Sequence, residues 1–191
     1  MTDVDEAAIE RLVAAAKDGD AMAFGRIFDI YHHPVHRYIV ARMRNPADAE
    51  DLTQLVFLKA LEALPRYEAR GIPFGGWLFR LARNAVIDHA RTHREYADLD
   101  TVMERAGSEP EPGAHAVASE EIEAVGQALA ALTDEQREAI ELRFFAGLSA
   151  REAAEAMGRQ EGTVRGLQFR AIAALRRHLG LDADEVADRG R

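Results

Sequence analysis

Six arginines between Gly147 and Gly180 are the side chains best suited to bind a ligand, because guanidinium groups pair with phosphates and with guanine edges. Only three glutamates accompany them. A short helix is predicted over 150–157, and the arginines continue along a longer predicted helix over about 161–178. A short helix, a glycine turn and a longer basic helix place the second helix in the major groove of DNA. The segment therefore predicts a helix-turn-helix that binds duplex DNA.

Two capping boxes predict where helices of this segment begin. Thr133 and Gln136 form one, and Ser149 and Glu152 form the other. Each box satisfies backbone N–H groups that have no partner in the first turn of a helix. The helix that follows Thr133 is expected to end at Gly147.

The composition excludes several classes of site. The chain has 191 residues and no cysteine, which removes disulfides, thiolate zinc sites and thiol nucleophiles. No apolar run approaches the roughly 20 residues of a membrane span, and the N-terminus lacks the apolar core of a signal peptide. We therefore expect a cytoplasmic protein that does not insert into a membrane.

The net charge of −9 argues against simple DNA binding, since phosphate contacts need cations. The charge is unevenly distributed, however. Residues 65–94 and 147–180 are net basic, and residues 95–123 hold nine acidic residues and one arginine. Two basic patches flanking an acidic connector suit weak intrinsic DNA affinity that is helped by a larger partner.

Helical periodicity dominates and the period-two alternation of strands is absent, so the chain is expected to be all-α. Glycines and prolines among acidic residues predict a flexible linker between two helical domains. The predicted division is an N-terminal domain at 1–95, a linker at 96–118, a helix-turn-helix domain at 119–181 and a tail at 182–191.

The N-terminal domain is expected to contain four helices. The first spans about 5–17, and Asp20 caps the second, which Pro34 should break or kink before it continues to Arg44. Asn45 and Pro46 start the third, which runs to about residue 64. A loop at 67–72 precedes a long helix that Pro73 opens and that ends near His93.

The third predicted helix is apolar on more than one face. Leu52 and Val56 fall on one side, whereas Leu58 and Leu61 spread round the helix. Such a helix is usually buried, which favours a central position in a bundle. The alternative is that part of this surface docks on a partner protein, with Gln54 in its polar rim.

The fourth predicted helix mixes aromatic residues with arginines, a combination that suits single-stranded nucleic acid. Trp77 is nevertheless expected in the core, because it recurs with Leu81 at helical spacing. His89 and His93 lie four residues apart, but no third ligand accompanies them and no metal is expected. Three further histidines surround Pro34 and are expected to face solvent: His32, His33 and His36.

Five stretches together resemble a known family. DAEDLTQLVF at 48–57 and PFGGWLFRLARNAVID at 73–88 look like domain 2 of the extracytoplasmic-function (ECF, group IV) sigma factors of the sigma-70 family. LTDEQREAIELRF at 132–144 and GLSAREAAEAM at 147–157, followed by EGTV at 161–164, look like domain 4. The resemblance implies a non-enzymatic protein without cofactors that binds core RNA polymerase and directs promoter recognition and DNA opening.

The resemblance also implies a role for the third helix, which would dock on the clamp helices of the largest polymerase subunit. Leu55 departs from the family pattern, where an acidic residue is usual. The residues assigned to polymerase binding are Asp48, Asp51, Gln54, Phe57 and Leu58.

Promoter recognition is implied for both domains. The loop at 67–72 and the helix after it would read the minus-ten element as an opened strand, through Tyr67, Arg70, Arg80, Arg83, Asn84 and Arg91. The last helix would read the minus-thirty-five element, through Arg159, Gln160, Glu161, Thr163, Arg165 and Arg170. Leu167, Gln168 and Phe169 depart from the family pattern and shift the apolar stripe by one residue.

The partners implied are the polymerase core, including the flap of its second-largest subunit, promoter DNA and an anti-sigma factor. The residues leave two other readings open. One is a stand-alone helix-turn-helix regulator with an N-terminal dimerisation or sensor domain, which would have no need of the basic patch at 80–94. The other is a metal-dependent enzyme using His89 and His93, which lacks the remaining ligands.

Overall fold

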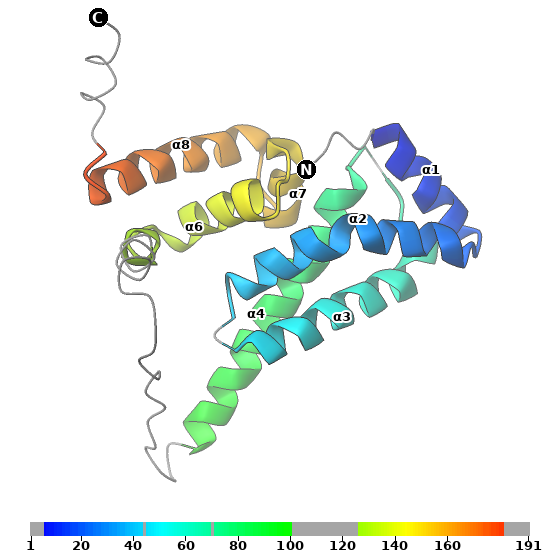
Figure 1. Cartoon of the computed structure of the whole chain (residues 1–191), viewed down its shortest axis with the longest axis horizontal. Helices are drawn as coiled ribbons and strands as arrows, with labels where there is room; N and C mark the ends of the chain where they lie inside the picture. The colour runs from blue at the N-terminus through cyan, green and yellow to red at the C-terminus, as the bar shows by residue number, and fades with distance from the viewer. Residues whose placement is uncertain (1–5, 44, 70, 101–125, 182–191) are drawn as a thin grey trace, which may run out of the picture.

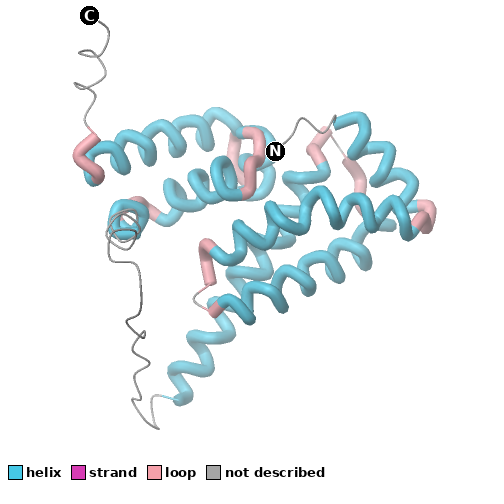
Figure 2. The backbone as a smooth tube through the Cα atoms, in the orientation of Figure 1, coloured by secondary structure: helices cyan, strands magenta, loops and turns pink. Residues whose placement is uncertain are grey.

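The computed structural model describes residues 6–43, 45–69, 71–100 and 126–181, with side chains described up to residue 92 in the helix that ends at 100. Every regular element in these ranges is helical (Figure 2). The expected all-α class is therefore confirmed.

The first two helices are α1 (Glu6–Lys17) and α2 (Ala21–Val40). Asp20 caps α2 as expected, because its side chain accepts hydrogen bonds from the backbone N–H groups of Met22 and Ala23. Pro34 was expected to break or kink this helix, and the break does not occur, since α2 runs through Pro34; α2 ends at Val40 rather than at residue 44. Tyr31, Val35 and Tyr38 pack in the core on both sides of the proline, which holds the helix in place despite the lost N–H donor.

The third helix, α3 (Pro46–Ala63), begins as the sequence predicts, with the Asn45 side chain accepting from the Ala47 N–H. A short 3-10 turn, η1 (Leu64–Arg66), leads into the loop. The long helix α4 (Phe74–Asp100) follows. Its expected end near His93 is wrong, because α4 continues into the range assigned to the linker; residues 101–118 of that range lie outside the described residues.

The C-terminal part follows the predicted order closely. Residues 126–130 are helical, and α6 (Asp134–Ile140) continues directly into one π-helical segment, η2 (Glu141–Phe145). Then come α7 (Ala150–Met157) and α8 (Glu161–His178). Both capping boxes are present, and α7 ends at Gly158 in the left-handed conformation with φ of 63°. Local capping chemistry therefore sets where these helices begin and end.

We call α1–α4 the N-terminal bundle and α6–α8 with η2 the C-terminal unit. In the view of Figure 1, α4 crosses behind α2 and α3, and the C-terminal unit lies beside the bundle. α4 packs directly on α7. One continuous hydrophobic core contains residues of both parts, including Tyr38 and Phe79 from the bundle and Leu142 and Leu148 from the C-terminal unit. The two parts therefore fold together as one body in this structure.

Several side chains can be compared with their predicted positions. Trp77 packs, partly buried, against the core, as predicted. His33 is exposed as expected, but the expectation is wrong for His32 and His36, which are half-buried. The His32 ring stacks on His36 at 6.1 Å between ring centroids and lies 4.7 Å from Phe28, because their helical face turns toward α3.

Two kinds of feature are absent from the described residues. No helix in the described ranges is long and apolar enough to cross a membrane. The described histidine, aspartate and glutamate side chains also contain no group of three that could hold a metal ion.

Candidate nucleic-acid interface

One face of α8 is turned into the core, which fixes the opposite face toward solvent. Val164, Leu167 and Ala171 are buried, at the spacing of one helical stripe. The candidate residues lie on the remaining surface or just before it: Arg159, Gln160, Thr163, Arg165 and Arg170 are exposed, and Glu161 is half-buried. Apart from Arg170, which lies in the middle of α8, the predicted residues lie at the N-terminal end of this helix, where a recognition helix usually contacts bases.

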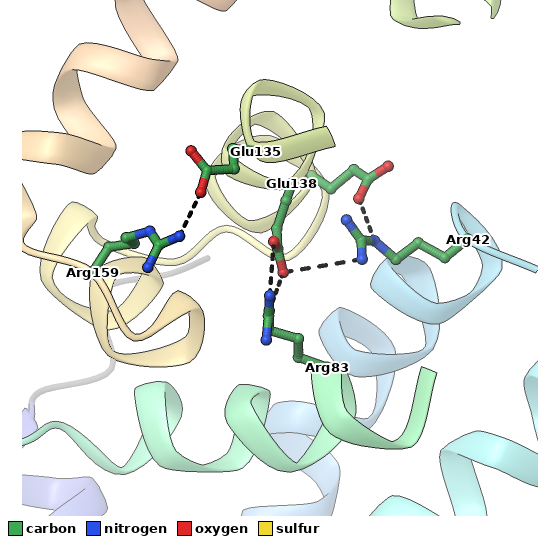
Figure 3. Close-up of polar contacts among 6 residues, drawn as sticks. Arg42, Arg83, Glu135, Glu138 and Arg159 are labelled. Carbon is green, nitrogen blue, oxygen red and sulfur yellow. Dashed lines mark hydrogen bonds and ion pairs between the residues drawn. The ribbon is translucent and has the colours of Figure 1, made fainter. Parts of the chain in front are cut away.

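Two of these arginines have partners within the C-terminal unit. Arg165 donates to the Glu161 carboxylate at 2.6 Å. Arg159 donates to the Glu135 carboxylate at 2.6 Å, as Figure 3 shows. Both pairs are well exposed, so they contribute little to stability and compete weakly with a phosphate or base edge. The C-terminal unit therefore holds these guanidinium groups in place without burying them.

The departures at 167–169 have a structural consequence. Leu167 is buried, Gln168 accepts a hydrogen bond from Arg143 at 3.0 Å, and Phe169 is 76% exposed. An exposed phenylalanine beside Arg165 and Arg170 adds an apolar surface to a basic face. Such a surface fits the methyl group of thymine.

The α4 candidates fall into two groups. Asn84 and Arg91 are exposed to solvent. Arg80 and Arg83 instead form ion pairs with the C-terminal unit: Arg80 donates to Glu155 at 2.7 Å, and Arg83 donates to Glu138 at 2.5 Å. The structure therefore brings two predicted strand-binding arginines together with carboxylates of α6 and α7.

Tyr67 is buried rather than presented at the surface. Its ring lies 5.5 Å from that of Phe74 and 4.8 Å from that of Trp77, and its hydroxyl donates to the Ile72 carbonyl at 3.2 Å. Burial raises the pKa of the Tyr67 hydroxyl, with nearby glutamates adding to the effect. This aromatic cluster holds the loop at 67–72 against α4; Arg70 lies outside the described residues.

A cavity of about 910 Å³ lies beside this loop. Its walls come mainly from α1, the loop, the start of α4, the end of η2 and the start of α7, with Lys17, Tyr67, Arg143 and Arg151 among the lining residues. Because part of the wall belongs to the C-terminal unit, the cavity has this shape only while the two parts are in contact.

On α3 the predicted polymerase-binding residues do not share one environment. Asp51 and Gln54 are exposed, Asp48 is half-buried and accepts from the Asn45 amide at 3.2 Å, and Phe57 is buried in the core. The sequence left open whether this helix is central in the bundle or docks part of its surface on a partner protein. In the structure Leu52, Val56 and Phe57 of α3 are buried, as a central helix requires, whereas three other leucines are exposed, and docking on a partner stays a prediction. We call that exposed row, Leu55, Leu58 and Leu61, the leucine strip.

The sequence did not predict a buried charge network that joins the N-terminal bundle to the C-terminal unit. Arg42 donates to Glu141 at 2.5 Å and also lies 4.0 Å from Glu138 (Figure 3). Glu138 and Glu141 are only 6% and 3% exposed. Burial raises the pKa of the Glu141 carboxyl, although the Arg42 guanidinium acts in the opposite direction. The sequence did contain a sign of this network, because Glu138 and Glu141 lie three residues apart on a helical face that is otherwise apolar. Acidic residues are seldom buried on such a face unless they are paired with a cation.

The sequence matches two family models. Residues 27–96 match Sigma-70 region 2, and residues 128–177 match Sigma-70 region 4. The first covers α3, the loop and most of α4, and the second covers α6 through nearly all of α8. The candidate surfaces on α3 and α4 therefore lie in region 2, and the one on α8 lies in region 4.

Individual proteins agree with these matches. The chain is 39% identical over 183 residues to the ECF RNA polymerase sigma factor BldN of Streptomyces coelicolor, spanning 95% of this chain and 69% of BldN. The structure of CnrH with the cytosolic domain of CnrY aligns with a TM-score of 0.67 and 27% identity, over 90% of this chain and 97% of that one. RpoE of Bartonella quintana, solved with the anti-sigma factor NepR, aligns with a TM-score of 0.62 and 28% identity, over 83% and 98%.

These matches decide among the three readings of the sequence, because stand-alone regulators and metal-dependent enzymes do not combine sigma regions 2 and 4. The fold, the order of the two regions and the length of the match to BldN all agree. The chain belongs to the ECF sigma factors of the sigma-70 family, which are not enzymes and which direct RNA polymerase in transcription initiation.

Proposed function

We propose that this sigma factor uses three separate surfaces: the leucine strip of α3 for polymerase, α4 for the opened minus-ten strand, and the outer face of α8 for the minus-thirty-five element. The observation that carries the proposal is the orientation of α8. Its apolar stripe is buried and its N-terminal polar residues are exposed beside exposed arginines. A helix held in this way can enter the major groove without any change in its own packing.

The leucine strip supports polymerase docking because it is apolar, exposed and flanked by Asp51 and Gln54. A row of exposed leucines rimmed by polar side chains is typical of a protein interface. We propose that the leucine strip contacts the clamp helices of the largest polymerase subunit. We propose a second contact between the C-terminal unit and the flap of the second-largest subunit. Such a protein acts in the cytoplasm, where polymerase and chromosome meet.

Strand binding by α4 is supported by four polar side chains along one helix. The Asn84 amide can pair with a base edge, and Arg80, Arg83 and Arg91 can hold phosphates. Tyr67 contributes to this surface indirectly, because its buried ring packs on Phe74 and holds the loop that leads into α4.

The Asn84→Ala variant is expected to lower promoter opening more than duplex binding, since a base edge is available to an amide only once the strands separate. Asn84 is exposed, so the variant should fold normally. Opening is measured by permanganate reactivity of unpaired thymines in the polymerase complex, and duplex binding by gel shift of the same complex. Equal losses in the two measurements would contradict this role.

The Arg165→Ala variant is expected to weaken recognition at one upstream base pair by roughly 1–3 kcal/mol, which is the discrimination that one bidentate contact supplies. Binding is measured on promoters that carry every base at each upstream position. Arg176→Ala is the matched control: it removes an exposed arginine from the last turn of the same helix, and it should weaken all sequences equally. A uniform loss for Arg165→Ala would assign this residue to phosphate.

We also propose that an anti-sigma factor regulates this chain. RpoE of Bartonella quintana was solved with NepR, and CnrH with the cytosolic domain of CnrY. The expected partner blocks run-off transcription when it is added before core polymerase, and a protein that inhibits only after the promoter complex has formed would contradict the assignment.

Run-off transcription tests the proposal as a whole. Purified bacterial core polymerase is given a promoter library with and without this protein. New start sites that share a two-block upstream motif are the expected result. Sequence-specific duplex binding by the protein alone, without any stimulation of transcription, would overturn the proposal.

A further inference from the structure

The outer face of α4 carries one apolar side chain among polar ones. Positions 80, 84, 87 and 91 follow one another at intervals of four, three and four residues, so they share one face of the helix. They hold Arg80, Asn84, Ile87 and Arg91, which are all exposed and which we call the outer row of α4. Of the α4 side chains that the structure describes, Ile87 is the only large apolar one that is exposed, at 44%.

The opposite face of α4 is buried in the core and fixes which way the outer row points. This face includes Leu78, Phe79, Ala82 and Ala85, none of which is more than 2% exposed. Ile87 belongs to neither of the two hydrophobic clusters that the described residues form. Its apolar surface therefore does not serve the packing of this fold and is free to contact a ligand.

A single exposed isoleucine is common on protein surfaces and by itself indicates no function. Ile87 differs in its neighbours. Asn84 lies about one turn before it and Arg91 about one turn after it, on the surface that we assign to the opened minus-ten strand. A strand whose base pairs with the Asn84 amide and whose phosphate meets the Arg91 guanidinium must pass over Ile87.

The chemistry of the bases determines what an aliphatic side chain can contact at this place. Beyond the hydrogen-bonding groups that every base presents, thymine alone carries a methyl group, at C5. An isoleucine gains by packing on that methyl group, whereas it would leave a polar base edge without a partner. Three residues of a helix rise about 4.5 Å, which is close to the roughly 3.4 Å between stacked bases. Ile87 and Asn84 can therefore face neighbouring bases of one strand.

We propose that Ile87 is a specificity-determining residue, which selects thymine at the position next to the base that Asn84 contacts, by packing on the thymine 5-methyl group. The inference rests on the proposed function of α4, because that function places the minus-ten strand on the outer row. It adds a base identity: a promoter of this sigma factor carries thymine beside the base that Asn84 reads.

Uracil tests this contact, because it differs from thymine only in lacking the methyl group. The full chain is combined with bacterial core polymerase, and a minus-ten sequence is selected from a promoter library. Binding is then measured by competition on forked DNA whose minus-ten strand is unpaired, with each thymine replaced in turn by uracil. The position that Asn84 reads is the one where Asn84→Ala abolishes the base preference.

Uracil beside that position should weaken binding of the parent holoenzyme by about fourfold, which is the effect of burying one methyl group. Ile87→Ala should bind the thymine and uracil fragments equally, and as weakly as the parent binds uracil. A selected sequence without thymine at this position would overturn the proposal. So would a methyl effect that is absent in the parent or unchanged in Ile87→Ala.

Two further variants separate a base contact from an effect on the helix. Ile87→Val keeps two branched methyl groups, so its preference for thymine should stay within about twofold of the parent value. Val40→Ala shortens a side chain of similar exposure, 42%, on α2 and should leave the preference unchanged. Equal loss of the preference in Val40→Ala and Ile87→Ala would count against a direct contact.

The same fragments distinguish failure of this inference from failure of the proposed function. If Asn84→Ala abolishes one base preference while Ile87→Ala keeps the methyl effect, Ile87 does not read the base and the role of α4 stands. If neither variant changes any preference, strand reading by α4 fails and the inference fails with it. If Ile87→Ala weakens both fragments but keeps their ratio, Ile87 contacts the strand without selecting a base, and the proposal is overturned.

Discussion

The Phe79→Ala variant is expected to lose about 3–5 kcal/mol of the free energy of unfolding, which is the cost of removing a fully buried phenylalanine. Phe79 is 0% exposed and its ring lies 5.7 Å from that of Tyr38, edge to face. It belongs to the core that the N-terminal bundle and the C-terminal unit share. In a urea titration followed by circular dichroism, the whole molecule should therefore unfold at a lower urea concentration than the parent protein.

The matched control is Phe169→Ala, which makes the same chemical change on α8. Phe169 is 76% exposed, so its removal should alter the free energy of unfolding by no more than about 0.5 kcal/mol. A similar loss for both variants would show that Phe169 is also buried in solution. A loss below about 1 kcal/mol for Phe79→Ala would mean that this core is loosely packed.

The Leu58→Asp variant is expected to weaken binding to core polymerase by about 100-fold, or about 2.7 kcal/mol. Leu58 is 53% exposed and lies in the middle of the leucine strip, so a carboxylate there remains hydrated in the free protein. In the complex that carboxylate would be desolvated against an apolar surface without a partner. The free energy of unfolding should change little, which separates a binding defect from misfolding.

Met22→Asp is the control for this experiment. Met22 is 76% exposed in the first turn of α2, outside the leucine strip, and an acid is favourable at that end of a helix. Binding to core polymerase, measured by competition against a labelled parent protein, should stay within about twofold of the parent value. Equal weakening by both variants would indicate a general effect of charge and would remove the leucine strip from the interface.

Local sequence signals determined where most helices lie. Asp20, Asn45, Thr133 and Ser149 each start a helix through a side-chain hydrogen bond to the first turn, and Gly158 ends α7 in a left-handed conformation. These interactions join residues two to four positions apart, so spacing alone reveals them. The exposed face of α8 was also predictable, because an apolar stripe fixes which side faces out.

Where local signals competed with packing, they misled. Pro34 lacks an N–H donor and its ring disfavours helix, yet α2 passes through it with Val35 and Tyr38 fully buried. The histidines beside it were expected to face solvent, but His36 lies 3.3 Å from the Thr53 hydroxyl of α3. Core contacts made by neighbouring residues outweigh the propensity of a single position.

By itself, the sequence determined that the protein is all-helical, that it carries a DNA-binding helix and which family it resembles, because those properties depend on patterns within single helices. Only the tertiary structure decided that Arg83 meets Glu138, that Arg42 meets Glu141, and that Leu58 stays exposed while Phe57 next to it is buried. The first two contacts join residues 55 and 99 positions apart, and the exposure of a leucine depends on which helices cover it. Spacing along one helix cannot specify the partner of a side chain on another, since that partner is set by how whole helices pack.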